Sequence, residues 1–199
     1  MFLSVALILG LAGPASAAPP AIPSEATARS QLAALTVRAP GSMSGYSRDR
    51  FPHWRSQPGG CDTRDRVLER DGTQIQYGSG CNVVGGRWVS PYDGGVWTDP
   101  ADVDIDHIVP LAEAWRSGAA SWTDSRRGDF ANDMSGPQLI AVTDNVNQSK
   151  GDQPPHEWQP PLTGYWCTYA RMWIGTKSRW GLSIVAAERT TLTQMLDRC

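Results

Sequence analysis

The sequence carries little charge and almost no lysine. Charged residues make up 19% of its 199 residues, below the usual share of about a quarter, and 18 basic against 20 acidic side chains leave a net charge of −2. Only Lys150 and Lys177 among the basic residues are lysines. With 40% hydrophobic residues, this composition argues against intrinsic disorder and against a polybasic surface that binds nucleic acid through charge alone.

Three further features are missing. The longest apolar run, Met1–Ala12, is shorter than the ~18 residues that a membrane-spanning helix needs, so no membrane span is expected. The four cysteines never form a Cys-x-x-Cys pair, which argues against a zinc knuckle. No Gly-x-Ser-x-Gly elbow occurs, which argues against a serine hydrolase.

The first residues have the pattern of a secretory signal peptide. Met1–Ala12 is apolar, and Ala15-Ser16-Ala17 has the small-x-small form of a signal-peptidase site. We therefore predict a signal peptide over residues 1–17, cleavage after Ala17, and a secreted, extracellular protein without membrane attachment.

Export makes oxidation of the cysteines the expectation. Cys61, Cys81, Cys167 and Cys199 can pair in three ways. Proximity in the sequence favours the pairs Cys61–Cys81 and Cys167–Cys199. Each of these pairs closes a loop long enough to stabilise the fold by ~2–4 kcal/mol.

The remaining chain divides into a linker with an N-terminal helix, residues 18–45, and one domain over residues 46–199. Gly85-Gly86 is typical of a hairpin turn between two strands. The predicted elements are helices 24–37 and 63–70, strands 74–77, 81–84 and 87–90, a strand within 96–105, helices 112–117 and 124–131, strand 138–142, and helices 144–150, 165–177 and 183–196. Helices at both ends with small antiparallel strands between them indicate the α+β class.

The segment 103–111 carries the densest chemical signal. As a strand it places Asp102, Asp104 and Asp106 on one face, where like charges need solvent or a cation. Pro110 ends the strand directly after His107, so a turn there can bring Asp106 and His107 into one site. The alternative is a solvated acidic edge followed by a core histidine.

A second signal lies on the predicted helix 144–150. Asp144, Asn147 and Lys150 are spaced i, i+3 and i+6 and therefore share one helix face. Amide and carboxylate oxygens suit Mg²⁺, and Lys150 offers a positive charge to a phosphate. The alternative is a polar helix face turned to solvent.

Together the two segments resemble the HNH endonuclease family, whose ββα-metal site runs strand, loop, strand, helix. Asp106-His107-Ile-Val-Pro110 resembles the Asp-His-x-x-Pro element of the first strand, and Asn147-Gln-Ser-Lys150 the Asn-x-x-Lys element of the helix. The likeness extends from Tyr46 to Cys199. Over this range the sequence is similar to a secreted branch of the family that is common in actinobacteria. Gln138 stands where the family usually carries an asparagine that holds the loop.

The resemblance implies a ββα-metal (HNH) core and a secreted endonuclease that depends on a divalent metal, Mg²⁺ or Mn²⁺. His107 would be the general base, because a neutral imidazole can take a proton from water. Asp106 and Asn147 would hold the metal, and Lys150 and Arg127 would contact the phosphate. The expected substrate is the phosphodiester backbone of DNA, with RNA left open; no organic cofactor and no obligate protein partner are expected.

Two other functions stay open at this point. One is a non-catalytic module stapled by disulfides, in which Asp104 and Asp106 hold structural Ca²⁺ and a tryptophan-rich surface binds cell-wall glycan or a protein. The other is a metal-dependent hydrolase of a different phosphoester. The combination of the Asp-His and Asn-x-x-Lys elements favours the nuclease.

Overall fold

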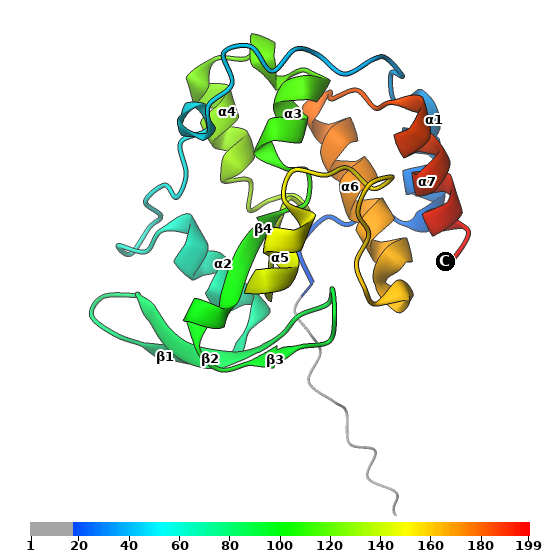
Figure 1. The fold of residues 1–199 in the computed structure, drawn as a ribbon. Helices are drawn as coiled ribbons and strands as arrows, with labels where there is room; N and C mark the ends of the chain where they lie inside the picture. Colours follow the sequence, from blue (N-terminus) through cyan, green and yellow to red (C-terminus); the bar gives the residue numbers. More distant parts are fainter. Residues whose placement is uncertain (1–17) are drawn as a thin grey trace, which may run out of the picture.

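The computed structural model describes residues 18–199, so the signal peptide predicted for residues 1–17 lies outside it. Short strands form two small antiparallel sheets with helices packed around them, which confirms the α+β class (Figure 1). The main elements are α1 (Glu25–Ala34), α2 (Thr63–Asp71), β1 (Thr73–Tyr77), β2 (Val83–Val89), β3 (Val96–Trp97), β4 (Val103–His107), α3 (Leu111–Ser117), α4 (Asp124–Ala131), β5 (Leu139–Thr143), α5 (Asp144–Lys150), α6 (Trp166–Trp180) and α7 (Ala186–Leu196). Within residues 18–199, no helix is both long and apolar enough to cross a membrane.

The first two helices begin within one residue of the starts predicted from the sequence. The side chain of Ser24 accepts a hydrogen bond from the backbone N–H of Thr27, which starts α1. Asp62 and Asp65 accept from each other's backbone N–H groups at the start of α2. These bonds satisfy N–H groups that have no partner inside the helix, and so they fix where each helix begins.

The predicted hairpin turn at Gly85-Gly86 is wrong. β2 runs straight through both glycines and pairs with β1 on one side and β3 on the other, and the chain turns before β2 instead. A Cβ atom at Gly86 would lie 2.7 Å from the ring of Trp88 and 2.9 Å from the side chain of Ile75. Gly86 therefore permits close packing inside a strand, a use of glycine that composition does not distinguish from a turn.

β4 and β5 form the second sheet, and α5 follows β5 without a loop. Their antiparallel register sets Val103 opposite Thr143 and His107 opposite Leu139. Within residues 18–199, β4 pairs with β5 alone, so its other edge has no described strand beside it. The connection between the two strands contains α3 and α4, and the chain thus runs strand, long connection, strand and helix (Figure 1).

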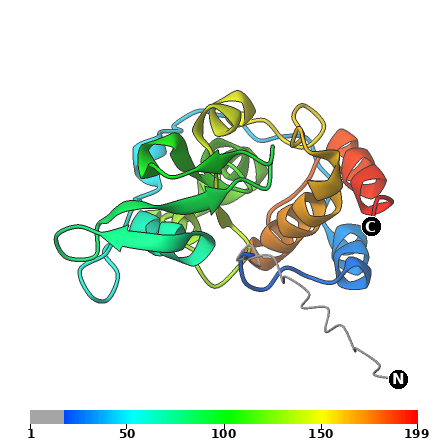
Figure 2. The same cartoon turned by 90° about the horizontal axis from the view of Figure 1, so that it is seen from below.

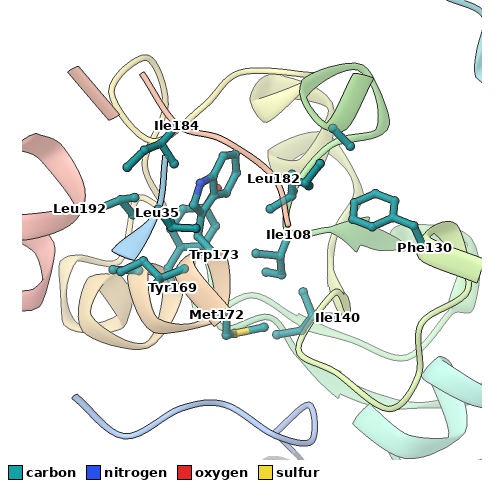
Figure 3. Close-up of a cluster of buried hydrophobic side chains, with 14 of the residues drawn as sticks. Leu35, Ile108, Phe130, Ile140, Tyr169, Met172, Trp173, Leu182, Ile184 and Leu192 are labelled. Atoms are coloured by element: carbon teal, nitrogen blue, oxygen red, sulfur yellow. The ribbon is translucent and has the colours of Figure 1, made fainter. Parts of the chain in front are cut away.

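Two hydrophobic clusters hold this second sheet from opposite faces. Ile140 of β5 packs into the larger cluster, which contains Ile108 and residues of α6 such as Trp173 (Figure 3). Leu139 enters a smaller cluster with residues of α2 and β2. Figure 2 shows α1, α6 and α7 grouped at one end of the molecule and the three-stranded sheet at the other. Because neighbouring residues of β5 are buried on both sides, the register of the β4–β5 pair is strongly fixed.

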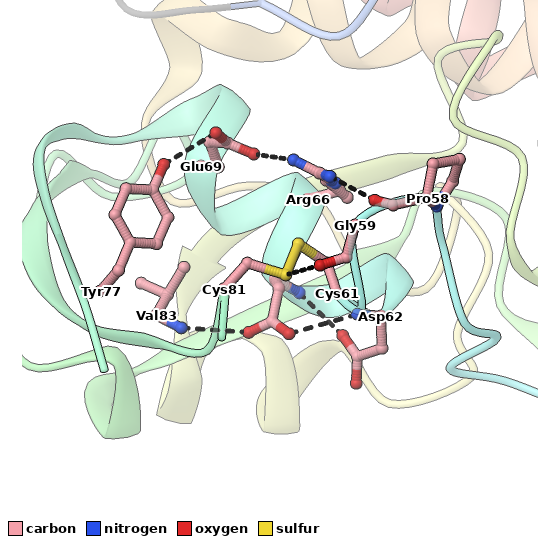
Figure 4. The surroundings of a disulfide bond; sticks show 10 residues. Pro58, Gly59, Cys61, Asp62, Arg66, Glu69, Tyr77, Cys81 and Val83 are labelled. Carbon is pink, nitrogen blue, oxygen red and sulfur yellow. Dashed lines mark hydrogen bonds and ion pairs between the residues drawn. A yellow bond between two sulfur atoms is a disulfide. The ribbon is translucent and has the colours of Figure 1, made fainter. Parts of the chain in front are cut away.

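Both disulfides join the cysteines that proximity favoured. Cys61 and Cys81 lie 5.3 Å apart between their Cα atoms and tie the start of α2 to the chain before β2 (Figure 4). Cys167 and Cys199, with Cα atoms 5.1 Å apart, tie α6 to the residue after α7. The second bond closes a sequence separation of 32 residues and fastens the C-terminal end to the larger cluster.

We predict that the double variant Cys167→Ser/Cys199→Ser loses about 3–4 kcal/mol of stability, because the unfolded chain regains the freedom of the open loop. For a chain of this size the melting temperature should fall by roughly 6–16 °C. Calorimetry of the variant beside the wild type measures this. An unchanged melting temperature, or four free thiols in the secreted protein, would contradict the disulfide account.

Candidate active site

A pocket of about 370 Å³ lies beside the end of β4. It is bordered by four successive residues of β4, 104–107, the last of which ends the strand. Its other walls come from the start of α3, from α5 and the two residues after it, and from a segment far earlier in the chain. The polar groups that matter below are Tyr46, Arg48, Asp104, Asp106, His107 and Asn147.

The ring of His107 is held from two sides. Its Nε2 lies 2.9 Å from the carbonyl oxygen of Ala131, the last residue of α4. The ring of Trp54 stacks on the imidazole, with centroids 5.5 Å apart and an interplanar angle of 8°. Since a carbonyl oxygen only accepts, Nε2 carries the proton and Nδ1 carries the lone pair. Among the described residues Nδ1 has no hydrogen-bond partner, and it is not sealed from solvent.

Burial also decides the charge of His107. The residue is only 5% exposed, and loss of water around the ring lowers its pKa to about 3, with the hydrogen bond to Ala131 opposing the shift and the charge of Arg48 adding to it. The imidazole is therefore neutral at physiological pH, with Nδ1 available as a proton acceptor. This is the form that a general base requires.

Asp106 and Lys150 form a buried ion pair behind the pocket. The Lys150 Nζ donates to both carboxylate oxygens of Asp106, at 2.7 and 2.6 Å, and to the carbonyl oxygens of His107 and Ile108, at 2.8 and 3.1 Å. The hydroxyl of Tyr92 donates to the same carboxylate. Burial raises the pKa of Asp106 and lowers that of Lys150, while the charge of each partner opposes the shift of the other.

These contacts bear on two expected roles. Lys150 is completely buried, and its three N–H groups have four acceptors within the protein, so contact with a phosphate would require it to leave Asp106. Asp106 is 4% exposed, and a metal ion at its carboxylate would have to displace the ammonium of Lys150. The pair instead fastens α5 to the point where the chain leaves β4.

Asp104 and Asn147 meet at the pocket itself. The side-chain amide of Asn147 donates to Oδ2 of Asp104 at 3.0 Å. The other carboxylate oxygen of Asp104 and the amide oxygen of Asn147 take no part in this hydrogen bond. Asp104 is half-buried, and burial, together with the negative charge of Asp144, raises its pKa. This strand–helix pair supplies two hard oxygen donors on the pocket side.

Arg127 does not reach the pocket. It is 1% exposed, and its guanidinium donates to the carbonyl oxygens of Arg50, Ala119 and Trp122 and pairs with Asp124. A guanidinium committed in this way holds backbone together and is not available to a substrate. The sequence pattern on α4 could not show that this side chain points inward.

Two further residues, Gln138 and Arg48, lie close to His107 or line its pocket. The side chain of Gln138 is fully buried, and its amide exchanges two hydrogen bonds with the backbone of Val109, at 3.1 and 2.9 Å, which holds the turn just after His107. Arg48 also lines the pocket, although no sequence pattern pointed to it. It lies in an irregular segment without periodicity, so no sequence signal connected it to His107.

The oxygen donors allow a test of the expected metal. Residues 18–199 contain no group of three or more His, Cys, Asp or Glu side chains that could hold an ion. Zn²⁺ sites usually require three or four such protein ligands, so zinc does not fit. Mg²⁺ keeps several of its waters and needs only one or two carboxylates, so the oxygens of Asp104 and Asn147 fit this ion.

Comparison with known proteins gives two results. Residues 62–195 match the family model described as the C-terminal domain of GmrSD restriction endonucleases. An uncharacterized secreted protein of Arthroderma benhamiae is 58% identical over 197 residues, which make up 99% of this chain and 96% of that relative. No solved structure matches the chain.

The relative's description as secreted confirms the predicted extracellular localisation, while cleavage after Ala17 stays a prediction. Its fungal source does not support the likeness to an actinobacterial branch. Because the family match covers well over half of the chain, the protein belongs to the family of the C-terminal domain of GmrSD restriction endonucleases, a nuclease-related domain.

Proposed function

We propose that the protein is a secreted endonuclease of the HNH type that hydrolyses phosphodiester bonds of nucleic acid, with His107 as the general base. The observation that carries the proposal is the fixed, neutral imidazole of His107 beside the pocket, with Nε2 bound to Ala131 and Nδ1 free. The family match and the order strand, connection, strand, helix support the same function.

The chemistry assigned to His107 is the removal of a proton from water. The water oxygen adds to the phosphorus while its proton passes to Nδ1, the bond to the leaving oxygen breaks, and the leaving alkoxide takes a proton from solvent. The negative charge of a phosphodiester bound nearby favours the imidazolium form. Substrate binding therefore raises the pKa of His107 in the direction that makes it a stronger base.

A divalent cation, Mg²⁺ or Mn²⁺, would be held by Asp104 and Asn147, which contribute oxygen donors to the pocket. Bound there, it would neutralise charge on the phosphate. Asp106 then has a different task from the one expected, because its buried pair with Lys150 keeps α5 and the end of β4 together. The arrangement needs one cation and one histidine.

The non-catalytic module has less support. Three of the nine tryptophans are buried and the other six are partly buried, so none presents the fully exposed ring expected of a glycan-binding surface. The carboxylate of Asp106, which was to share a Ca²⁺ with Asp104, already accepts from Lys150 and Tyr92. The nuclease is therefore the better supported of the two functions.

We predict that His107→Gln lowers the rate of plasmid cleavage by about 10²–10⁴-fold, the usual effect of losing a general base. The glutamine side chain can still donate a hydrogen bond to the carbonyl oxygen of Ala131. A lower cleavage rate therefore reports the loss of the proton acceptor and not the loss of this hydrogen bond. Cleavage is measured in Mg²⁺ and in EDTA, with His156→Ala as the matched control. His156 lies outside this pocket, and its variant should cleave like the wild type.

Two outcomes would contradict the proposal. Wild-type protein with intact disulfides that cleaves neither DNA nor RNA in Mg²⁺ or Mn²⁺ would remove the proposed function. Wild-type rates from His107→Gln, with the same unfolding curve, would remove the role of His107.

A further pair of variants separates metal binding from stability. Asp104→Asn should weaken Mn²⁺ binding at least tenfold with little change in stability, because it removes a charged ligand from a half-buried site. Lys150→Met should lose about 3–5 kcal/mol of stability, because it leaves the Asp106 carboxylate buried without its partner. Calorimetric Mn²⁺ titration and urea unfolding measure the two effects. If Asp104→Asn binds Mn²⁺ as tightly as the wild type, the cation site is misplaced.

A further inference from the structure

A segment ahead of the family match supplies part of the pocket. Tyr46 and Arg48 line it, and Trp54 stacks on His107, although the match begins only at residue 62. The elements that the family model covers therefore build only part of the pocket wall. The preceding segment, residues 46–54, supplies two residues of the pocket wall and the ring that stacks on His107.

We propose that Arg48 binds the phosphate of the substrate in this pocket, an inference that rests on the proposed function and names the residue that holds the substrate. Arg48 is the only arginine or lysine among the residues that line the pocket. Within the described part of the chain its exposed guanidinium has no hydrogen-bond or ion-pair partner. Arg48 is close enough to His107 for its charge to add to the lowering of that residue's pKa.

The charges around the pocket leave this role to Arg48. Asp106 pairs with Lys150, and the Nη1 of Arg116 lies 2.9 Å from the Asp152 carboxylate. The remaining carboxylate, that of Asp104, is the one that the proposed cation would neutralise. His107 is neutral and adds no positive charge. An incoming phosphodiester therefore meets the uncompensated guanidinium of Arg48. Its planar fork of N–H groups matches two phosphate oxygens at once.

The backbone under Arg48 is held in place. It forms a single turn, Arg48–Arg50, and the buried guanidinium of Arg127 donates to the carbonyl oxygen of Arg50 at 3.0 Å. The next residue, Phe51, is fully buried and packs edge-on against Trp115. Arg127 thus acts as a positioning residue, since it joins α4, whose last carbonyl orients His107, to the turn that presents Arg48.

The test compares Arg48→Ala and Arg48→Lys with the control Arg50→Ala in the full secreted protein with both disulfides formed. Arg50 lies in the same turn and is also exposed, but its side chain does not line the pocket. Binding of a short fluorescent DNA duplex is followed by anisotropy in EDTA over a range of salt concentrations. Cleavage of the same duplex is followed in Mg²⁺.

If Arg48 holds a phosphate, Arg48→Ala reduces the slope of log affinity against log salt by about 0.9, the value of one lost phosphate contact. Its cleavage rate falls by about 10²–10³-fold, the effect of removing one group that stabilises developing charge. Arg48→Lys recovers the salt slope but not the full rate, because a lysine keeps the charge and loses the fork. Arg50→Ala stays close to the wild type in both measurements.

Arg48→Ala that binds and cleaves like Arg50→Ala overturns the inference, and so does a wild-type protein that does not bind the duplex at all. A wild type that binds but never cleaves, with the salt slope still reduced in Arg48→Ala, removes the proposed nuclease function and leaves Arg48 as the phosphate-binding residue. The two failures are thus distinguishable.

Discussion

The buried ion pair between Asp106 and Lys150 is the constraint on which the site depends. One ammonium group binds the carboxylate and two backbone carbonyls at the end of β4, so helix α5 cannot move away from that strand. Such a pair is costly to bury and is retained only where every donor and acceptor is satisfied. Here this condition is met, and the result is a fixed distance between the residues that follow Asp106 and those on α5. The ion pair thereby fixes the position of His107 relative to Asn147.

The second constraint on the pocket comes from helix α4. The carbonyl oxygen of Ala131 fixes which nitrogen of His107 carries the proton, and Arg127 on the same helix holds the turn that carries Arg48. The connection between β4 and β5 therefore orients His107, the proposed base, and also holds the turn that carries Arg48. The disulfides and the two hydrophobic clusters keep this connection and the earlier segment against the sheet.

Much of the fold could be predicted from local signals. The predicted starts of α1 and α2 lie within one residue of the observed ones, and sequence proximity favoured the observed cysteine pairs. Side-chain periodicity placed Asp104 and Asp106 on one face of β4, but it could not tell which would meet a lysine. Lys150 was expected to offer its charge to a phosphate, and no local pattern shows that this lysine is buried, which is rare for the residue type. Arg48 was missed because its irregular segment reaches the pocket only through tertiary packing, which no local pattern records.

The central claim is that His107 is a neutral base whose Nδ1 is free because Nε2 binds Ala131. The most direct measurement is a pH titration of the imidazole nitrogens by ¹⁵N NMR, in which only three histidines contribute and His107→Gln assigns one of them. The account predicts a His107 signal in the Nε2–H form that stays neutral at pH 5, since burial lowers its pKa to about 3. A His107 signal that titrates near its ordinary value of about 6.5, or one in the Nδ1–H form, would contradict it.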